Sequence, residues 1–328
     1  MIFFSFLFLF NVFTHSLMMI LVAGLVLMLG LVEVCAAPTP TPTPVDQQNI
    51  TVLTSSQINT FAPYTWYTSA AYCAPDKIIS WDCGANCDAN PNFKPVASGG
   101  DGAGVQYWYV GYDPTLDTVI VSHQGSVIEH VVPVIIDIQF SLVPLDDSLF
   151  PGIGDDILVH RGFRNEQAVT AKDVLDAVTR AMSEYGCTSV TMVGHSLGGA
   201  IALIDSIYLP LWLPSGTSFQ TVTYGLPRVG NPAFANYVDS HTRLTHINNQ
   251  HDPVPVVPFM SMDYAHPSGE IHIEGNNDWA VCPGHDNPSR RCIVGADDQV
   301  LKTTLADHWG PYNGVMLGCP YNPVWDAA

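Results

Sequence analysis

Residues 191–200 read TMVGHSLGGA, and Ser196 stands in this stretch between Gly194 and Gly198. The pattern G-x-S-x-G directly after an apolar run is typical of a sharp turn from strand to helix, which exposes a nucleophilic serine hydroxyl. The other interpretation is a glycine-rich turn with a capping serine. A serine hydroxyl is a weak nucleophile and needs a histidine base that a third group holds. The nucleophile hypothesis therefore requires an acid and a histidine elsewhere in the chain.

The order expected with such a turn is Ser, then acid, then His. Asp252 follows the apolar stretch RLTHINN and lies in the loop QHDPVPVVP. Active groups of parallel sheets sit on loops at the carboxyl ends of strands, so we expect Asp252 to be the acid. Its rivals, Asp205 and Asp239, fall inside predicted helices. The other interpretation of Asp252 is a turn residue before proline.

Four histidines follow this acid in the chain, at positions His266, His272, His285 and His308. The first precedes Pro-Ser-Gly, the second lies in the strand-like run GEIHIE, and the third lies in the short span between two cysteines. His308 stands in ADHWGPYNG, a loop near the C-terminus. The order favours His308 as the base, and the alternative is a structural histidine beside Trp309.

Ester or amide hydrolysis by such a serine also needs donors for a developing oxyanion. One donor should be the backbone N–H of Leu197, directly after the nucleophile. The other should come from an earlier strand end. The run VIVSHQGS ends at Gly125-Ser126, where a backbone N–H and a hydroxyl could be presented together; an ordinary turn is the alternative.

The apolar pattern predicts the elements that position these residues. We expect a first helix within 54–72, helices at 165–185, 197–209 (closed by Pro210) and 232–241, and strands at 104–112, 118–126, 188–193, 220–225 and 243–249. Alternating strands and helices imply a mainly parallel central sheet with helices on both faces. No composition break divides residues 60–319, so we expect one domain.

The composition excludes several classes of partner. The 328 residues carry a formal net charge of −19 with only 11 Lys and Arg. Binding to nucleic acid or docking on anionic lipid by charge needs a basic surface, so both are disfavoured. An acidic, self-repelling chain suits the extracellular medium.

The N-terminus differs from the rest of the chain. Residues 1–36 are almost wholly apolar and lack Lys and Arg, and Val34-Cys35-Ala36 provides small residues before a cleavage point at Ala37. We expect a signal peptide at 1–36, with translation from Met18 or Met19 also open, and an uncleaved membrane anchor as the alternative. Residues 37–53, which include PTPTPTP, are expected to be a spacer or propeptide with an N-glycosylation site at Asn49. The domain should then span 54–328.

Seven cysteines remain after cleavage at Ala37, so at most three disulfides form and one thiol stays free. Cys187 is the expected free thiol because it opens the apolar strand before Ser196. No C-x-x-C pair and no H-E-x-x-H motif occurs, so disulfides in an oxidising compartment are preferred over zinc.

Together, six segments resemble the secreted fungal class 3 lipases, which are α/β-hydrolases related to Mucor-type lipases: VSHQGS, VHRGF, VGHSLGGA, YGLPRVGNPAFANYVD, HINNQHDPVPVVP and DHWGPYNG. The resemblance covers roughly residues 64–319. It implies nucleophile Ser196, acid Asp252, base His308, and oxyanion groups Ser126 and Leu197. It also suggests disulfides Cys73–Cys319, Cys83–Cys87 and Cys282–Cys292.

The sequence departs from the family pattern in two places. Gln124 stands where many members have arginine, which removes the usual support of that position. Residues 127–143 lie where the family has its lid and are unusually apolar. They are expected to be a lid that opens on lipid, or alternatively a core strand.

The first functional hypothesis is a secreted carboxylic ester hydrolase, a triacylglycerol lipase that acts at a lipid interface. It would be a monomer without cofactor, metal or stable membrane anchor. The second hypothesis is a feruloyl or other carboxylesterase on the same fold. The third is a non-catalytic binding protein on the hydrolase fold.

Overall fold

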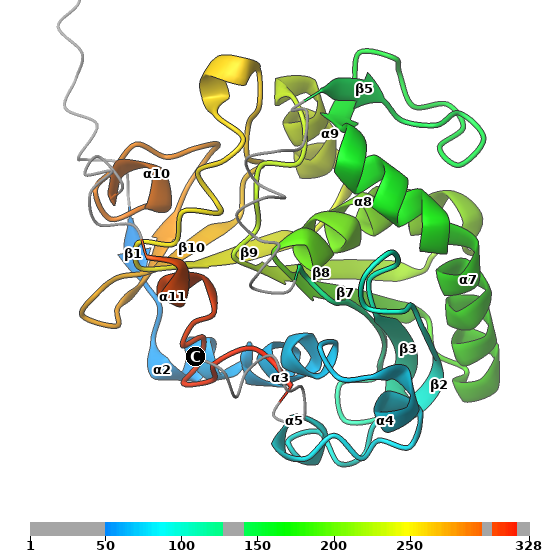
Figure 1. Cartoon of the computed structure of the whole chain (residues 1–328). Helices are drawn as coiled ribbons and strands as arrows, with labels where there is room; N and C mark the ends of the chain where they lie inside the picture. The colour runs from blue at the N-terminus through cyan, green and yellow to red at the C-terminus, as the bar shows by residue number, and fades with distance from the viewer. Residues whose placement is uncertain (1–49, 127–140, 297–303, 320–328) are drawn as a thin grey trace, which may run out of the picture. The chain divides into compact units, whose positions relative to one another are not determined.

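A central sheet, mostly parallel, carries the fold (Figure 1). The computed structural model describes residues 50–126, 141–296 and 304–319, which all fall within the unit Val45–Ala328. The expected signal segment 1–36, the sequon residue Asn49 and most of the expected lid 127–143 lie outside the described residues.

Among the described residues the sheet has nine strands in the order β1-β11-β10-β9-β8-β7-β4-β3-β2. Neighbours from β4 to β10 pair in parallel, and the edge strands pair antiparallel. The strands are β1 (Thr51–Val52), β2 (Lys94–Gly99), β3 (Trp108–Asp113), β4 (Thr118–His123), β7 (Ser189–His195), β8 (Ser218–Tyr224), β9 (Leu244–Asn249), β10 (Glu270–Ile273) and β11 (Trp279–Cys282). A separate two-stranded sheet joins β5 (Leu142–Pro144) and β6 (Leu158–His160).

Helices cover both faces of the sheet (Figure 1). They are α2 (Ser55–Asn59), α3 (Ala62–Ala70), α4 (Pro75–Ile79), α5 (Ala85–Asp88), α7 (Arg161–Tyr185), α8 (Leu197–Trp212), α9 (Pro232–His241), α10 (Ile293–Ala296), α11 (Leu305–His308) and the 3-10 turn η2 (Met260–Met262). The expectation of an α/β-hydrolase with a mainly parallel sheet and helices on both faces is confirmed.

Successive side chains of the central strands point to opposite faces of the sheet and so contribute to two apolar cores. On β4, Val119 and Val121 join the core beneath α7 and α8, whereas Ile120 points into the opposite core, which Tyr67 and Tyr72 help to fill. The middle of β4, residues 119–121, is therefore a continuous apolar run, as expected for a parallel strand buried on both faces.

Most element boundaries differ by a few residues from the sequence expectation, α7 for example beginning at Arg161 and not at 165, and three differences change the layout of the elements. The helix after Ser196 does not stop at Pro210 but continues to Trp212, because proline's fixed φ is helical and the Leu213 N–H still reaches the Leu209 oxygen at 3.0 Å. The expected first helix is two helices, with Pro63 in the first turn of the second. Finally, Thr51 and Val52 pair with β11, so the sheet begins inside the segment expected to be spacer.

Disulfides join Cys73 to Cys319, Cys83 to Cys87 and Cys282 to Cys292, and Cys187 is free and buried. These are the pairs that the family resemblance suggested. The first of them ties the end of α3 to the last described residue of the chain. In the described part of the chain, no helix combines the length and the hydropathy needed to cross a bilayer.

Glu270, the first residue of β10, is a buried carboxyl group near the start of α10. Its Oε1 accepts the Ile293 N–H at 2.7 Å. Burial outweighs that hydrogen bond and raises the pKa of Glu270 to about 7.

We expect Glu270→Gln to gain stability relative to the native protein as pH rises from about 4.5 to about 7. In this window the unfolded carboxyl loses its proton while the folded one keeps it. The free energy of unfolding of the native protein therefore falls by about 3 kcal/mol as pH rises from about 4.5 to about 7. Glutamine cannot ionise and keeps the accepting oxygen. Urea midpoints of both proteins across this window measure the difference, and parallel pH curves would contradict the assignment.

Candidate active site

Ser196 occupies a sharp turn between β7 and α8. Its backbone has φ 56° and ψ −127°, a conformation that a non-glycine residue rarely adopts. Its N–H donates to the Tyr224 oxygen at 3.0 Å on the neighbouring strand β8. A Cβ on Gly194 would lie 2.2 Å from the Gly198 oxygen, and one on Gly198 would lie 2.2 Å from the His123 oxygen. Both positions need glycine because backbone meets backbone there.

Asp252 and His308 form a fully buried pair. The His308 Nδ1–H donates to Asp252 Oδ2 at 2.8 Å, and Asp252 Oδ1 accepts the Val254 N–H at 2.8 Å. His308 Nε2 makes no hydrogen bond with any described residue. The ring therefore has one nitrogen fixed by a carboxylate and the other available to exchange a proton.

The His308 ring lies against the nucleophile turn. Its centroid is 4.3 Å from that of His195, the residue directly before Ser196. A Cβ on Gly225 would lie 2.9 Å from both Asp252 Oδ2 and His308 Nδ1. Since Gly225 follows the residue whose oxygen holds Ser196, the three predicted catalytic residues meet at the carboxyl ends of β7, β8 and β9.

A line of buried hydrogen bonds fixes the main chain of His308. The Tyr72 hydroxyl lies 2.6 Å from His195 Nδ1, and His195 Nε2 lies 2.7 Å from the His308 carbonyl oxygen. A carbonyl can only accept, so His195 carries its proton on Nε2 and accepts from Tyr72. Burial and the neighbouring His308 hold the pKa of His195 well below its usual range, which keeps this ring neutral.

Two further contacts tie the segment before His308 to the acid loop. The Asn249 side-chain amide donates to the Asp307 carbonyl at 3.0 Å, and the His251 N–H donates to the Asp307 carboxylate at 3.2 Å. His308, on the four-residue helix α11, is thus attached through Asp307 to the segment that carries Asp252.

The two expected oxyanion groups lie on two chain segments that pack against each other, the start of α8 and the turn after β4. Leu197 is the first residue of α8, so its N–H belongs to the unpaired first turn of that helix. Ser126 is buried just beyond β4. Its neighbour Gly125 lies against the nucleophile, since a Cβ there would be 3.0 Å from that of Ser196.

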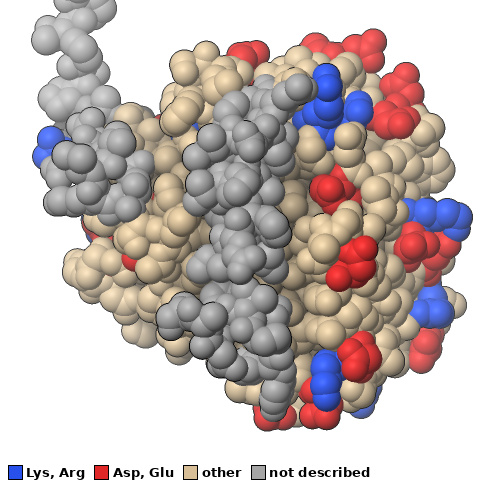
Figure 2. Space-filling model, in the orientation of Figure 1, with Lys and Arg blue, Asp and Glu red and all other residues tan. Residues whose placement is uncertain are grey.

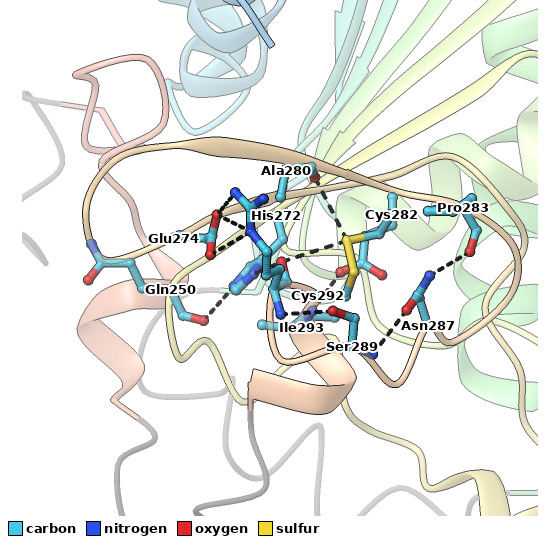
Figure 3. Close-up of a disulfide and its surroundings, with 12 residues drawn as sticks. Gln250, His272, Glu274, Ala280, Cys282, Pro283, Asn287, Ser289, Cys292 and Ile293 are labelled. Atoms are coloured by element: carbon cyan, nitrogen blue, oxygen red, sulfur yellow. Dashed lines mark hydrogen bonds and ion pairs between the residues drawn. A yellow bond between two sulfur atoms is a disulfide. The ribbon is translucent and has the colours of Figure 1, made fainter. Parts of the chain in front are cut away.

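The structure places the rival acids and bases in other contacts. Asp205 binds His123 and Gln167, and Asp239 binds Ser268 and His285. His266 donates to the Pro255 oxygen at 2.8 Å. Figure 3 shows His272 beside the Cys282–Cys292 disulfide, with its ring nitrogens 2.8 Å from the Gln250 oxygen and 2.9 Å from the Arg291 oxygen. None of these described residues makes a hydrogen bond or an ion pair with Asp252.

Glu270, Cys282 and Cys292 form one group of described residues close enough to share a metal ion. The two cysteines are joined to each other, so neither offers a thiolate, and the group does not fit a metal.

Fold and site together define a serine hydrolase of the α/β-hydrolase class. The family described as Lipase (class 3) matches residues 120–262. The secreted mono- and diacylglycerol lipase MDL3 of Malassezia globosa is 33% identical over 223 residues, which are 67% of this chain and 71% of that protein. The chain belongs to the class 3 lipase family.

Two further comparisons agree. The secreted mono- and diacylglycerol lipase MDL2 of Malassezia globosa is 35% identical over 164 residues, so the match spans 49% of this chain and about half, 52%, of that relative. A triacylglycerol lipase described as having a serine protease triad at its catalytic centre superposes with a TM-score of 0.69 at 28% identity, over 82% of this chain and 98% of that one. The chain is one of the secreted class 3 lipases, which are serine ester hydrolases.

We expect Gly225→Ala to lower the turnover number by about 10²-fold, because the added methyl group would displace the Asp252–His308 pair and a shift of about 1 Å costs that much. The control is Gly186→Ala. Gly186 also has positive φ, 66° against 52°, but a Cβ there meets nothing within 4 Å. Both variants place an alanine at positive φ, so equal activities would contradict the prediction.

Proposed function

We propose that this protein hydrolyses acylglycerol esters through a covalent acyl-enzyme on Ser196. The buried Asp252–His308 hydrogen bond beside the serine turn is the observation that carries the proposal. It supplies the one feature a weak hydroxyl nucleophile needs, an oriented base with its second nitrogen unoccupied by described residues.

In the proposed reaction Ser196 Oγ attacks the ester carbonyl while His308 Nε2 takes its proton and passes it to the leaving alcohol. Water then attacks the acyl-enzyme with the same histidine as base. Asp252 keeps the histidine in its Nδ1–H form and stabilises the cation. The N–H of Leu197 and the Ser126 residue hold the oxyanion.

Removing the nucleophile tests this role directly. We expect Ser196→Ala to lower hydrolysis of a soluble p-nitrophenyl ester by at least about 10³-fold, with the thermal midpoint unchanged because only one oxygen is lost. Ser206→Ala, another buried serine of the same helix, is the matched control and should keep its activity. A folded Ser196→Ala protein with a few per cent of native activity would refute the mechanism.

Two acylglycerol classes are supported by different observations. The names of the sequence relatives favour mono- and diacylglycerols, whereas the structural neighbour favours triacylglycerols. Initial rates on monoolein, diolein, triolein and methyl ferulate, measured side by side, separate these classes. Hydrolysis of methyl ferulate alone would favour a feruloyl esterase and overturn the proposal.

An exposed apolar turn supports action at a lipid surface. Phe259, Met260 and Met262 are 55%, 52% and 39% exposed, and they lie in the loop that leaves the acid Asp252. This loop is the yellow turn at the top of Figure 1, and the surface over it in Figure 2 is predominantly uncharged. With a net charge of −19, the protein would be repelled by anionic lipid. We therefore propose that this turn contacts an uncharged lipid surface, with the enzyme as a monomer.

Replacing Phe259, Met260 and Met262 together by serine should weaken adsorption to triolein droplets by about tenfold or more, since each lost apolar contact costs on the order of 1 kcal/mol. Hydrolysis of a soluble ester should not change. Val169→Ser is the control because Val169 is 58% exposed on α7. If the turn variant and the control adsorb equally, the lipid contact lies elsewhere.

A further inference from the structure

A second buried acid–histidine pair lies outside the proposed catalytic machinery. His123 Nε2 donates to Asp205 Oδ2 at 2.8 Å, and the Gln167 amide donates to Asp205 Oδ1 at 2.9 Å. All three side chains are at most 1% exposed. They join the last residue of β4 to the middle of α8 and to α7.

This cluster is costly where it lies. The helix α8 is otherwise filled with apolar and small residues, and the core around it is made of Val, Leu, Ile and Met side chains. Taking a carboxylate out of water costs several kcal/mol unless each oxygen finds a partner, and well-packed apolar residues would often be at least as stable. Stability alone therefore does not account for Asp205.

The position of His123 gives the cluster a specific task. His123 ends β4, and the chain then turns through Gln124 and Gly125 to the oxyanion residue Ser126. The turn rests on the start of α8, since a Cβ on Gly198 would lie 2.2 Å from the His123 oxygen. The helix start also carries Leu197, so the strand end and α8 hold the two oxyanion donors.

The side chain of Gln124, which follows His123, is hydrogen-bonded to the segment before β3. Gln124 Oε1 accepts the Tyr107 N–H at 2.9 Å, and the Gln124 N–H donates to the Tyr107 oxygen at 2.8 Å. The Gln124 side chain thus extends the pairing of β3 and β4 and makes no hydrogen bond to α8, although the Gln124 main chain lies against Gly198 at the start of that helix. Among the described side chains of this turn, His123 makes the hydrogen bond that joins it to the helix.

We propose that His123 and Asp205 are positioning residues of the oxyanion hole, which set the distance between the Ser126 turn and the Leu197 N–H by tying β4 to α8. The inference rests on the proposed ester hydrolysis. Neither residue touches substrate, and their effect on the rate is exerted through the placement of the two donors.

The test compares His123→Phe, Asp205→Leu and Asp205→Asn. The first keeps an aromatic ring without a hydrogen bond, and the second removes the carboxylate. In Asp205→Asn the carbonyl still accepts from His123, and the amide can donate to Gln167 Oε1, which has no partner among the described atoms, once that amide turns. We expect the first two to lower kcat on p-nitrophenyl butyrate by about 10²-fold with KM unchanged, and Asp205→Asn to stay within about threefold of native.

A second readout reports the oxyanion hole without turnover. Diethyl p-nitrophenyl phosphate is a neutral triester that phosphorylates an active serine and releases p-nitrophenolate, and the negative charge that develops on its phosphoryl oxygen during the attack needs the same two donors. The inactivation rate should fall in parallel with kcat in His123→Phe and Asp205→Leu.

The matched control lies at the opposite end of β4, where its first residue is tied to β7. Thr118 and Thr191, on β4 and β7, share a buried hydrogen bond of 3.0 Å. Thr118→Val breaks it and should lower the thermal midpoint without a change in kcat.

The inference is overturned if folded His123→Phe has the kcat of Thr118→Val, if only KM changes, or if Asp205→Asn loses as much as Asp205→Leu. Should Asp205→Leu not fold, His123→Phe and Asp205→Asn still decide. Failure of the proposed function itself would appear separately, as activity retained by Ser196→Ala.

Discussion

The buried hydrogen bond between Asp252 and His308 is the interaction on which the site depends. Asp252 lies just beyond the end of the parallel strand β9, whereas His308 lies on the short helix α11, where no strand of the sheet positions it directly. A base held only by a loop would sample many positions, and catalysis tolerates little displacement. His195 and Asn249 donate to the main-chain oxygens of His308 and Asp307, and the Asp307 carboxylate accepts the His251 N–H. These three hydrogen bonds therefore hold the chain segment that carries the His308 imidazole.

The second constraint on the architecture is that main-chain segments of the site must approach one another closely. Helix α8 begins directly over β4, and Gly194, Gly198 and Gly225 lie where the serine turn, the oxyanion turn and the Asp252–His308 pair meet. A side chain at any of these positions would separate groups that must nearly touch. The cost is a turn in which Ser196 has an unfavourable backbone conformation, which the surrounding packing must hold in place.

A feature of the fold or the site could be predicted from the sequence where neighbouring residues alone determine it. The G-x-S-x-G motif and the order Ser, Asp, His pointed to three residues that the structure brings to one edge of the sheet. The predicted end of α8 at Pro210 was wrong. A proline near the end of a helical pattern usually indicates that the helix ends, but the φ of proline is itself helical and α8 continues to Trp212. The roles of Tyr72, Gly225 and the His123–Asp205 pair had no local signal. Their partners lie tens to over a hundred residues away, and only the folded chain brings them together.

The Cys73–Cys319 disulfide links residues 246 positions apart and closes the domain around its own last segment. The ribosome completes the nucleophile turn long before it reaches His308, so a growing chain has a serine but no base. The C-terminal segment that carries His308 gains its covalent tie to the rest of the domain when Cys319 meets Cys73 in an oxidising compartment. Order of synthesis and redox environment together place this covalent closure last, after the chain has entered an oxidising compartment.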